Sequence, residues 1–184
     1  MCADDSEYVR KMYGGYFGVF IRMLAEEGEA WHVYRVSSGE IPEDDDEIDL
    51  YDGFVITGSC NDAHGNDAWI HRLLALLHKL DSMKKKILGV CFGHQVRELP
   101  AKAEVIAWSD KTGIEMFRYG DHIMGIQGHP EYTSDILFHL IDRLVQRNFI
   151  LEAFGEEVRA KMELREPDKE AWKRLCRSFL KGRI

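Results

Sequence analysis

A cysteine between two glycines is the residue whose surroundings most favour nucleophilic chemistry: Cys91, in Gly-Val-Cys-Phe-Gly at positions 89–93. The apolar run that ends at this cysteine, residues 87–91, predicts a buried strand, and the residues after it can begin a helix. A sharp strand-to-helix turn lifts the side chain clear of the sheet, and a Cβ at either glycine would crowd that turn. The helix N-terminus favours the thiolate and leaves the Phe92 amide free to donate to an oxyanion. The pattern predicts a thiol nucleophile, with a buried structural cysteine as the alternative.

A thiol nucleophile needs a base, and His129 stands out among the eight histidines. It follows an apolar stretch, residues 123–127, that predicts a strand, and it precedes Pro130, which cannot continue a ladder or a helix. Glu131 can turn back to orient the imidazole, as the third group does in nucleophile–base–orienter sets. Taken alone, His129 could equally be structural. With Cys91 and Glu131 at matching strand ends, the pattern favours catalysis.

Other polar residues favour chemistry less. His94, next to the nucleophile motif, could also serve as the base, but its position along the expected helix favours a packing or surface role. Cys60, His64 and His71 have spacings that could suggest a metal site, yet the fourth ligand that zinc usually requires is absent. Gly14-Gly15 lacks the length and the Lys-Ser/Thr ending of a phosphate-binding loop. We therefore expect no metal and no cofactor.

The composition is typical of a soluble globular protein, with 45% hydrophobic and 30% charged residues in a chain of 184. At this length we expect a single domain spanning residues 1–184. The 24 Lys and Arg against 32 Asp and Glu give a formal net charge of −8. Nucleic-acid binding is therefore not expected, because it depends on clustered basic residues, and the basic run at 84–86 is short.

The apolar stretches are too short to cross a membrane, and the acidic start of the chain lacks the apolar core of a secretory signal. The four cysteines (Cys2, Cys60, Cys91 and Cys176) lie far apart without a C-x-x-C pair. That spacing suits reduced thiols better than a disulfide framework. We expect a cytosolic protein with no membrane partner, and the sequence does not indicate an oligomeric state.

Strands and helices alternate along the chain. The expected strands are residues 31–36, 53–57, 87–91, 104–108, 114–118 and 123–127, and the expected helices are residues 17–24, 69–80, 134–147 and a C-terminal segment. Residues 53–57 form an apolar run of the type buried on both faces of a parallel sheet, and the acidic run 43–47 is expected to be a solvated loop. Thr133 is the expected N-cap of the helix at 134–147. This alternation predicts an α/β sandwich around a mostly parallel sheet.

Two motifs, Gly-Val-Cys-Phe-Gly-His-Gln at 89–95 and Gln-Gly-His-Pro-Glu at 127–131, resemble those of class I glutamine amidotransferase domains. The resemblance implies a flavodoxin-like three-layer sandwich and a Cys-His-Glu triad that hydrolyses a γ-glutamyl amide. It assigns roles to six residues: nucleophile Cys91, base His129, orienter Glu131, oxyanion amides at Gly58 and Phe92, and a contact to the substrate's glutamyl group at Gln95.

Segments at 13–16, 51–58, 83–91, 126–132 and 179–183 resemble more closely the plant γ-glutamyl peptidases of that family. These enzymes remove the γ-glutamyl residue from glutathione conjugates in sulfur metabolism. The resemblance implies a hydrolase that forms a glutamyl thioester, takes a small-molecule γ-glutamyl substrate and uses no cofactor. Two alternatives stay open: a glutaminase subunit that supplies ammonia to a separate synthetase, and a catalytically silent member of the family.

The chain departs from the family pattern in two places. The family begins with an apolar strand at the centre of its sheet, whereas here only Met1-Cys2-Ala3 precede the acidic Asp4-Asp5. The family also carries a sizeable segment between the helix after the nucleophile and the stretch matching Leu99-Pro100, whereas here Gln95 is followed at once by residues 96–100. We therefore expect a sheet without its first strand, a shortened helix, and apolar surface and backbone left exposed.

Overall fold

The computed structural model describes residues 1–42, 44–96 and 99–184. A five-stranded sheet forms its centre, in the order β1-β2-β5-β4-β3. The strands are β1 (Gly53–Ile56), β2 (Lys86–Val90), β3 (Glu104–Ser109), β4 (Gly113–Tyr119) and β5 (Ile123–Ile126). β1, β2 and β5 pair in parallel, whereas β4 is antiparallel to both β5 and β3. Four of the five strands therefore run in one direction, which confirms the expected mostly parallel sheet.

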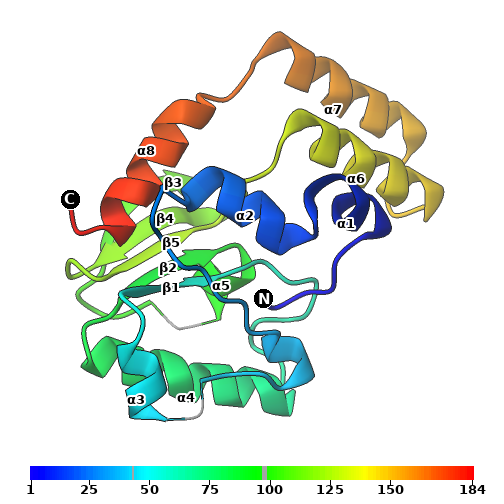
Figure 1. Ribbon diagram of the computed structural model, residues 1–184. Helices are drawn as coiled ribbons and strands as arrows, with labels where there is room; N and C mark the ends of the chain where they lie inside the picture. The colour runs from blue at the N-terminus through cyan, green and yellow to red at the C-terminus, as the bar shows by residue number, and fades with distance from the viewer. Residues whose placement is uncertain (43, 97–98) are drawn as a thin grey trace.

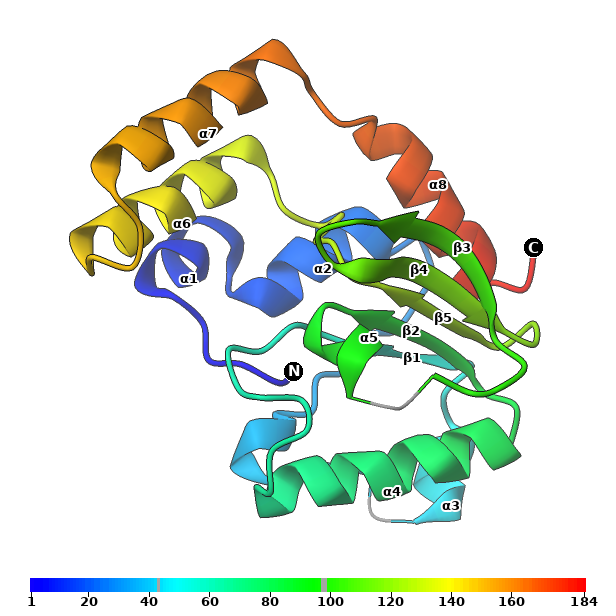
Figure 2. The ribbon, with the colours of Figure 1, turned by 180° about the vertical axis from the view of Figure 1, so that it is seen from behind.

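Helices cover both faces of the sheet and complete the expected three-layer sandwich (Figures 1 and 2). One face carries α3 (Asp45–Asp49) and α4 (Ala68–Ser82). The other face carries α2 (Tyr16–Leu24) and α8 (Lys169–Leu180), with α1 (Glu7–Tyr13), α6 (Ser134–Gln146) and α7 (Glu152–Leu164) alongside. The remaining helices are the 3₁₀ turn η1 (Val36–Ser38) and α5 (Phe92–Gln95). Within the described ranges, every helix is too short or too polar to span a bilayer.

The amphipathic pattern of the sequence places the core on each face. The buried side of α4, with Leu73, Leu77 and Leu80, packs in one apolar cluster with Ile56 and Ile87 of the sheet. A second cluster on the opposite face joins α2 and α8 to the sheet through buried residues that include Leu24, Leu88, Val90, Met124 and Phe179. All three helices therefore bury the apolar stripe that their 3.6-residue periodicity predicts.

The prediction of a strand at residues 31–36 is wrong. The segment is irregular and ends in η1. Its neighbour is Met1, whose N-terminal ammonium donates to the Tyr34 carbonyl at 2.6 Å and whose carbonyl accepts from the Val36 amide at 3.0 Å. The backbone amide of the next residue, Cys2, donates to the Thr57 hydroxyl at 2.9 Å. A ladder needs an extended partner along its length, and one residue is too short to provide it.

β1 lies at the edge of the sheet instead of being buried on both faces. Gly53, Phe54 and Val55 are half-buried, and only Ile56 of the four is fully buried. A cavity of about 740 Å³ opens beside this strand, between it and the irregular segment around Trp31. The apolar run at 53–57 therefore predicts the strand correctly but not its place in the sheet.

β3 forms the opposite edge and is exposed along most of its length. Val105, Ile106 and Trp108 are 45%, 48% and 63% exposed. This is the exposed apolar surface that the shortened sequence predicts. The segment that leads into β3 contains positions 97 and 98, which lie outside the described residues, as does position 43 in the acidic run.

Residues 45–47 of the acidic run are helical instead of forming a loop. Asp44 is the N-cap of α3, and its side chain accepts from the Glu47 amide at 2.8 Å. Negative side chains in a first turn are favoured by the free N–H groups there.

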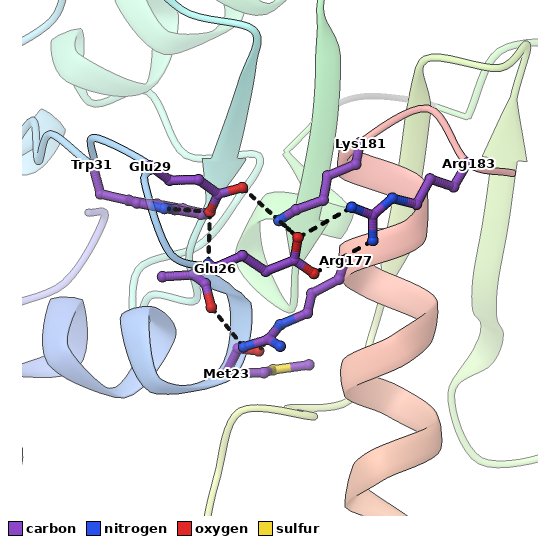
Figure 3. A network of polar contacts seen from close by, with 8 residues as sticks. Met23, Glu26, Glu29, Trp31, Arg177, Lys181 and Arg183 are labelled. Carbon is purple, nitrogen blue, oxygen red and sulfur yellow. Dashed lines mark hydrogen bonds and ion pairs between the residues drawn. The ribbon is translucent and has the colours of Figure 1, made fainter.

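The ends of α2 and α8 are joined by a network of polar contacts (Figure 3). The Arg177 guanidinium donates to the carbonyls of Met23 and Ala25 at 2.9 and 2.6 Å, and thereby satisfies backbone groups at the end of α2. Lys181 forms an ion pair with Glu29 at 2.7 Å, and Arg183 donates to Glu26. The C-terminal helix is thus fixed to an N-terminal one.

Candidate active site

Cys91 lies at a sharp turn between β2 and α5, with a φ of 53° and a ψ of −105°. Left-handed backbone of this kind is uncommon outside glycine and is kept where the surrounding structure enforces it. The enforcement comes from close packing: a Cβ at Gly89 would lie 2.2 Å from the Gly93 carbonyl, and one at Gly93 would lie 2.3 Å from the Ile56 carbonyl. Both glycines that flank the cysteine are therefore required by space.

Hydrogen bonds hold the same turn from both sides. The Cys91 amide donates to the Ile126 carbonyl on β5 at 2.8 Å, and the Cys91 carbonyl accepts from the His94 amide at 2.9 Å. Phe92 is the first residue of α5, where an N–H group has no acceptor within the helix. Its side chain is buried and stacks on Trp69 of α4, with ring centroids 5.3 Å apart.

His129 and Glu131 come from the turn that follows β5. The Nδ1 atom of His129 and Oε1 of Glu131 are 2.7 Å apart. Glu131 is only 5% exposed, and its other oxygen, Oε2, has no hydrogen-bond partner among the described residues. Since Nδ1 is taken by the carboxylate, Nε2 is the nitrogen left to face the thiol.

The charge state of His129 follows from these neighbours. Burial alone would lower the pKa of His129, but hydrogen bonds with Cys91 and Glu131 outweigh it and raise the pKa to about 9. The protonated imidazole is therefore favoured at neutral pH.

Gly58 lies against both members of this pair. A Cβ at Gly58 would sit 2.7 Å from Cε1 and 3.4 Å from Nε2 of His129, and 3.5 Å from Cβ of Cys91. A side chain at this position would displace the imidazole. The fold thus brings together Gly58, Cys91, His129 and Glu131 from three loops that follow β1, β2 and β5.

Gln95 also lies near the nucleophile, but through another residue. Its Nε2 donates to Oε1 of Gln127 at 2.9 Å, and Nε2 of Gln127 in turn lies 3.9 Å from the Cys91 sulfur. Gln127 was not singled out from the sequence as a site residue. Its position directly after β5 was the available signal.

Tyr132 is the other site residue that the sequence reasoning missed. Its ring stacks on the His129 imidazole, with centroids 4.2 Å apart and planes 10° from parallel. Adjacency to the His-Pro-Glu motif was the signal for it.

The remaining candidates lie elsewhere. His94 is buried, packs 5.1 Å from the Phe117 ring and has a pKa lowered by burial, in keeping with the packing role. Cys60, His64 and His71 are exposed, and no group of three or more metal-binding side chains occurs in the part of the chain that the structure describes. All four cysteines are free thiols. Burial raises the pKa of Cys176 to about 12, helped by the nearby charge of Glu131.

Comparison with known proteins identifies relatives along the whole chain. The sequence is 41% identical to γ-glutamyl peptidase 5 of Arabidopsis thaliana, over 100% of this chain and 94% of that protein. It is 38% identical to γ-glutamyl peptidase 3 of the same plant, over 97% and 93% of the two chains. A putative glutamine amidotransferase of Saccharomyces cerevisiae is 24% identical over 96% of this chain and 94% of its own length. No protein-family profile matches the chain.

Among solved structures, a glutamine amidotransferase from Thermotoga maritima matches with a TM-score of 0.66 at 15% identity, over 98% of this chain and 95% of that one. This similarity supports the fold. The alignment with peptidase 5 spans 237 positions, and since this chain has 184 residues, about 53 positions of the relative have no counterpart here. The expected shortening relative to the family is therefore real. With this fold and this identity over nearly the full length of its relatives, the chain belongs to the γ-glutamyl peptidase family of enzymes.

Proposed function

We propose that this chain is a cysteine peptidase that hydrolyses the γ-glutamyl amide bond of glutathione conjugates. The observation that carries the proposal is the grouping of Cys91, His129, Glu131 and Gly58 at the ends of three parallel strands. The names of the relatives supply the bond type, because four of them are γ-glutamyl peptidases of Arabidopsis thaliana.

In the first half of the reaction, the Cys91 sulfur attacks the carbonyl carbon of the γ-glutamyl amide and forms a tetrahedral intermediate. The amides of Gly58 and Phe92 are the proposed donors to its oxyanion. The C–N bond then breaks, His129 delivers a proton from Nε2 to the leaving amine, and a glutamyl thioester remains on Cys91. A raised pKa suits this step because the imidazole must enter it protonated.

In the second half, the thioester has no negative charge on sulfur. One of the contacts that raise the pKa of His129 is thereby weakened, so the imidazole becomes a better base. His129 takes a proton from water, the water oxygen attacks the thioester carbonyl, and free glutamate leaves as the thiol is restored. Glu131 keeps the imidazole oriented through both steps. Gln95 is proposed to hold the glutamyl group, with Gln127 beside it.

The test measures glutamate released from glutathione and from a bulky S-conjugate of glutathione by the purified chain. Cys91→Ala should abolish release, whereas Cys60→Ala, which removes an exposed thiol, should leave it unchanged. Glutamine is included as a competing substrate, since a preference for it would favour a glutaminase subunit. If the folded wild-type chain released no glutamate from any of the three, the chain would be a silent member of its family, as the shortened α5 allows.

A further inference from the structure

The imidazole of His129 is fixed by more than its carboxylate partner. Glu131 holds one ring nitrogen, and the backbone of Gly58 limits the space next to the other. The hydrogen bond with Glu131 meets the edge of the ring at Nδ1 and does not cover its flat face. Tyr132 does so, because the two rings are nearly parallel, with centroids 4.2 Å apart.

Tyr132 is itself well anchored. Its amide donates to the His129 carbonyl at 3.2 Å, so the two residues share one turn. Its ring also stacks on Tyr16, with centroids 6.0 Å apart, and both tyrosines pack against the buried cluster of Val9, Val19 and Ile136. Tyr16 begins α2, where its amide donates to the Asp5 carboxylate at 2.6 Å. The Tyr132 ring is therefore held in place by its packing against α2.

We propose that Tyr132 is a positioning residue that holds the His129 ring in the plane that faces Cys91 and favours its charged form. The face of an aromatic ring carries negative charge density, which attracts a cation above it. A planar neighbour at stacking distance also restricts rotation of the imidazole about its own side-chain bond. The proposal rests on the proposed function, in which His129 is the acid and base.

The other groups facing His129 act in the same direction or are neutral. Cys91 approaches from the turn after β2, and Glu131 from the turn after β5; both favour the imidazolium. Cys176 of α8, which feels the charge of Glu131, is a neutral thiol, since burial raises its pKa to about 12. The phenol of Tyr132 also stays neutral, because burial raises its pKa above the ordinary value.

The test is the pH dependence of Cys91 alkylation by iodoacetamide, measured by mass spectrometry in a Cys60→Ala background. In this reaction the sulfur displaces iodide and needs no γ-glutamyl substrate. Tyr132→Phe keeps the stacked ring and should retain the wild-type profile. Tyr132→Leu and Tyr132→Met remove the stacked ring and should move the alkaline inflection to lower pH by about 0.5 unit. The two unstacked variants should also lower kcat for glutamate release about tenfold with little change in KM.

Two results would overturn the proposal. One is an alkylation profile in both unstacked variants that coincides with that of the wild type while near-UV circular dichroism shows an intact fold. The other is a Tyr132→Phe variant as impaired as Tyr132→Leu, since the hydroxyl would then be the active part. Failure of the proposed function is seen separately, as absent glutamate release from the wild type. The imidazole NMR signal that disappears in His129→Gln provides an independent reading of its titration in each variant.

Discussion

Cys91 and His129 follow neighbouring strands, yet the helices after those strands differ greatly: α5 has four residues and α6 has thirteen. The nucleophile is held by close contact between small groups, at Gly89 and Gly93. The base is held by the charge of Glu131 and the stacked ring of Tyr132. The nucleophile side therefore depends on shape, and the base side depends on electrostatics.

The motif spacing places the expected mid-chain shortening on the nucleophile side. α5 ends just before the positions that the structure does not describe, and β3, with its exposed Trp108, follows. A turn held by backbone contacts with β1 and β5 does not need a long helix for its own geometry. This is why the cysteine still sits at the apex of the turn.

The largest effect is expected on the base side, from Glu131→Gln. An amide keeps the shape of the carboxylate but removes the charge that supports the imidazolium, so kcat for glutamate release should fall by about 10²- to 10⁴-fold. The fold should survive. Glu157→Gln, on the exposed face of α7, is the matched control and should have no effect on turnover. Activity within threefold of the wild type would show that the carboxylate does not orient the base.

On the nucleophile side, Gly93→Ala should destabilise the protein by about 3 kcal/mol, because the new Cβ would lie 2.3 Å from the Ile56 carbonyl. Urea unfolding measures the loss, and activity should fall with it. Gly128→Ala, two residues past β5, is the control: a Cβ there meets nothing within 4 Å. Equal stability of the two variants would contradict the claim that close packing at Gly93 holds the nucleophile turn.

The pH dependence of stability should follow His129. Its pKa is raised from about 6.5 to about 9 by folding, so the stabilisation is complete below pH 6.5 and is lost as pH rises through 9. The difference in unfolding free energy between the wild type and His129→Gln should therefore shrink over this window. The matched control is His78→Gln on the exposed face of α4, which leaves the contacts of His129 in place. If the difference in unfolding free energy for His129→Gln did not change with pH, the ion pair of His129 with Glu131 would not contribute to stability.

The smallest effect is expected far from both sides, at the network in Figure 3. Arg177→Met should cost about 1–2 kcal/mol, because two carbonyls at the end of α2 lose their donor. Turnover should not change. Arg183→Met, which breaks a solvent-exposed pair with Glu26, should leave both stability and turnover unchanged. A loss of activity in Arg177→Met would mean that the helical layer, and not local contacts alone, positions the site.

The strands, most helices and the nucleophile turn could be predicted from sequence because each depends on local pattern. Residues 87–91 and 123–127 form β2 and β5 with shifts of one residue or fewer, and Gly113 and Gly120 adopt the positive φ that their turns require. The grouping of Cys91 with His129 and Glu131 followed from parallel strands ending at one edge.

Other features were out of reach because they depend on neighbours. Residues 31–36 have strand composition, but a strand forms only beside an extended partner, and the backbone bonds of Tyr34 and Val36 go to a single residue, Met1. Residues 53–57 look like a central strand and form an edge. The stack of Tyr132 on His129 depends on a ring orientation that no spacing specifies. The short α1 was missed as well, although Ser6 caps it.

Tryptophan fluorescence can report separately on the exposed β3 edge and on the turn that carries Cys91. Trp108 stands 63% exposed on β3, while Trp31, Trp69 and Trp172 are half-buried. Iodide should therefore quench emission from Trp108 first, which reports on the open edge of the sheet. Trp69, stacked on Phe92, should respond instead when the turn that carries the cysteine loosens. The protein thus contains one natural optical reporter for the exposed edge and another for the nucleophile, with no label needed.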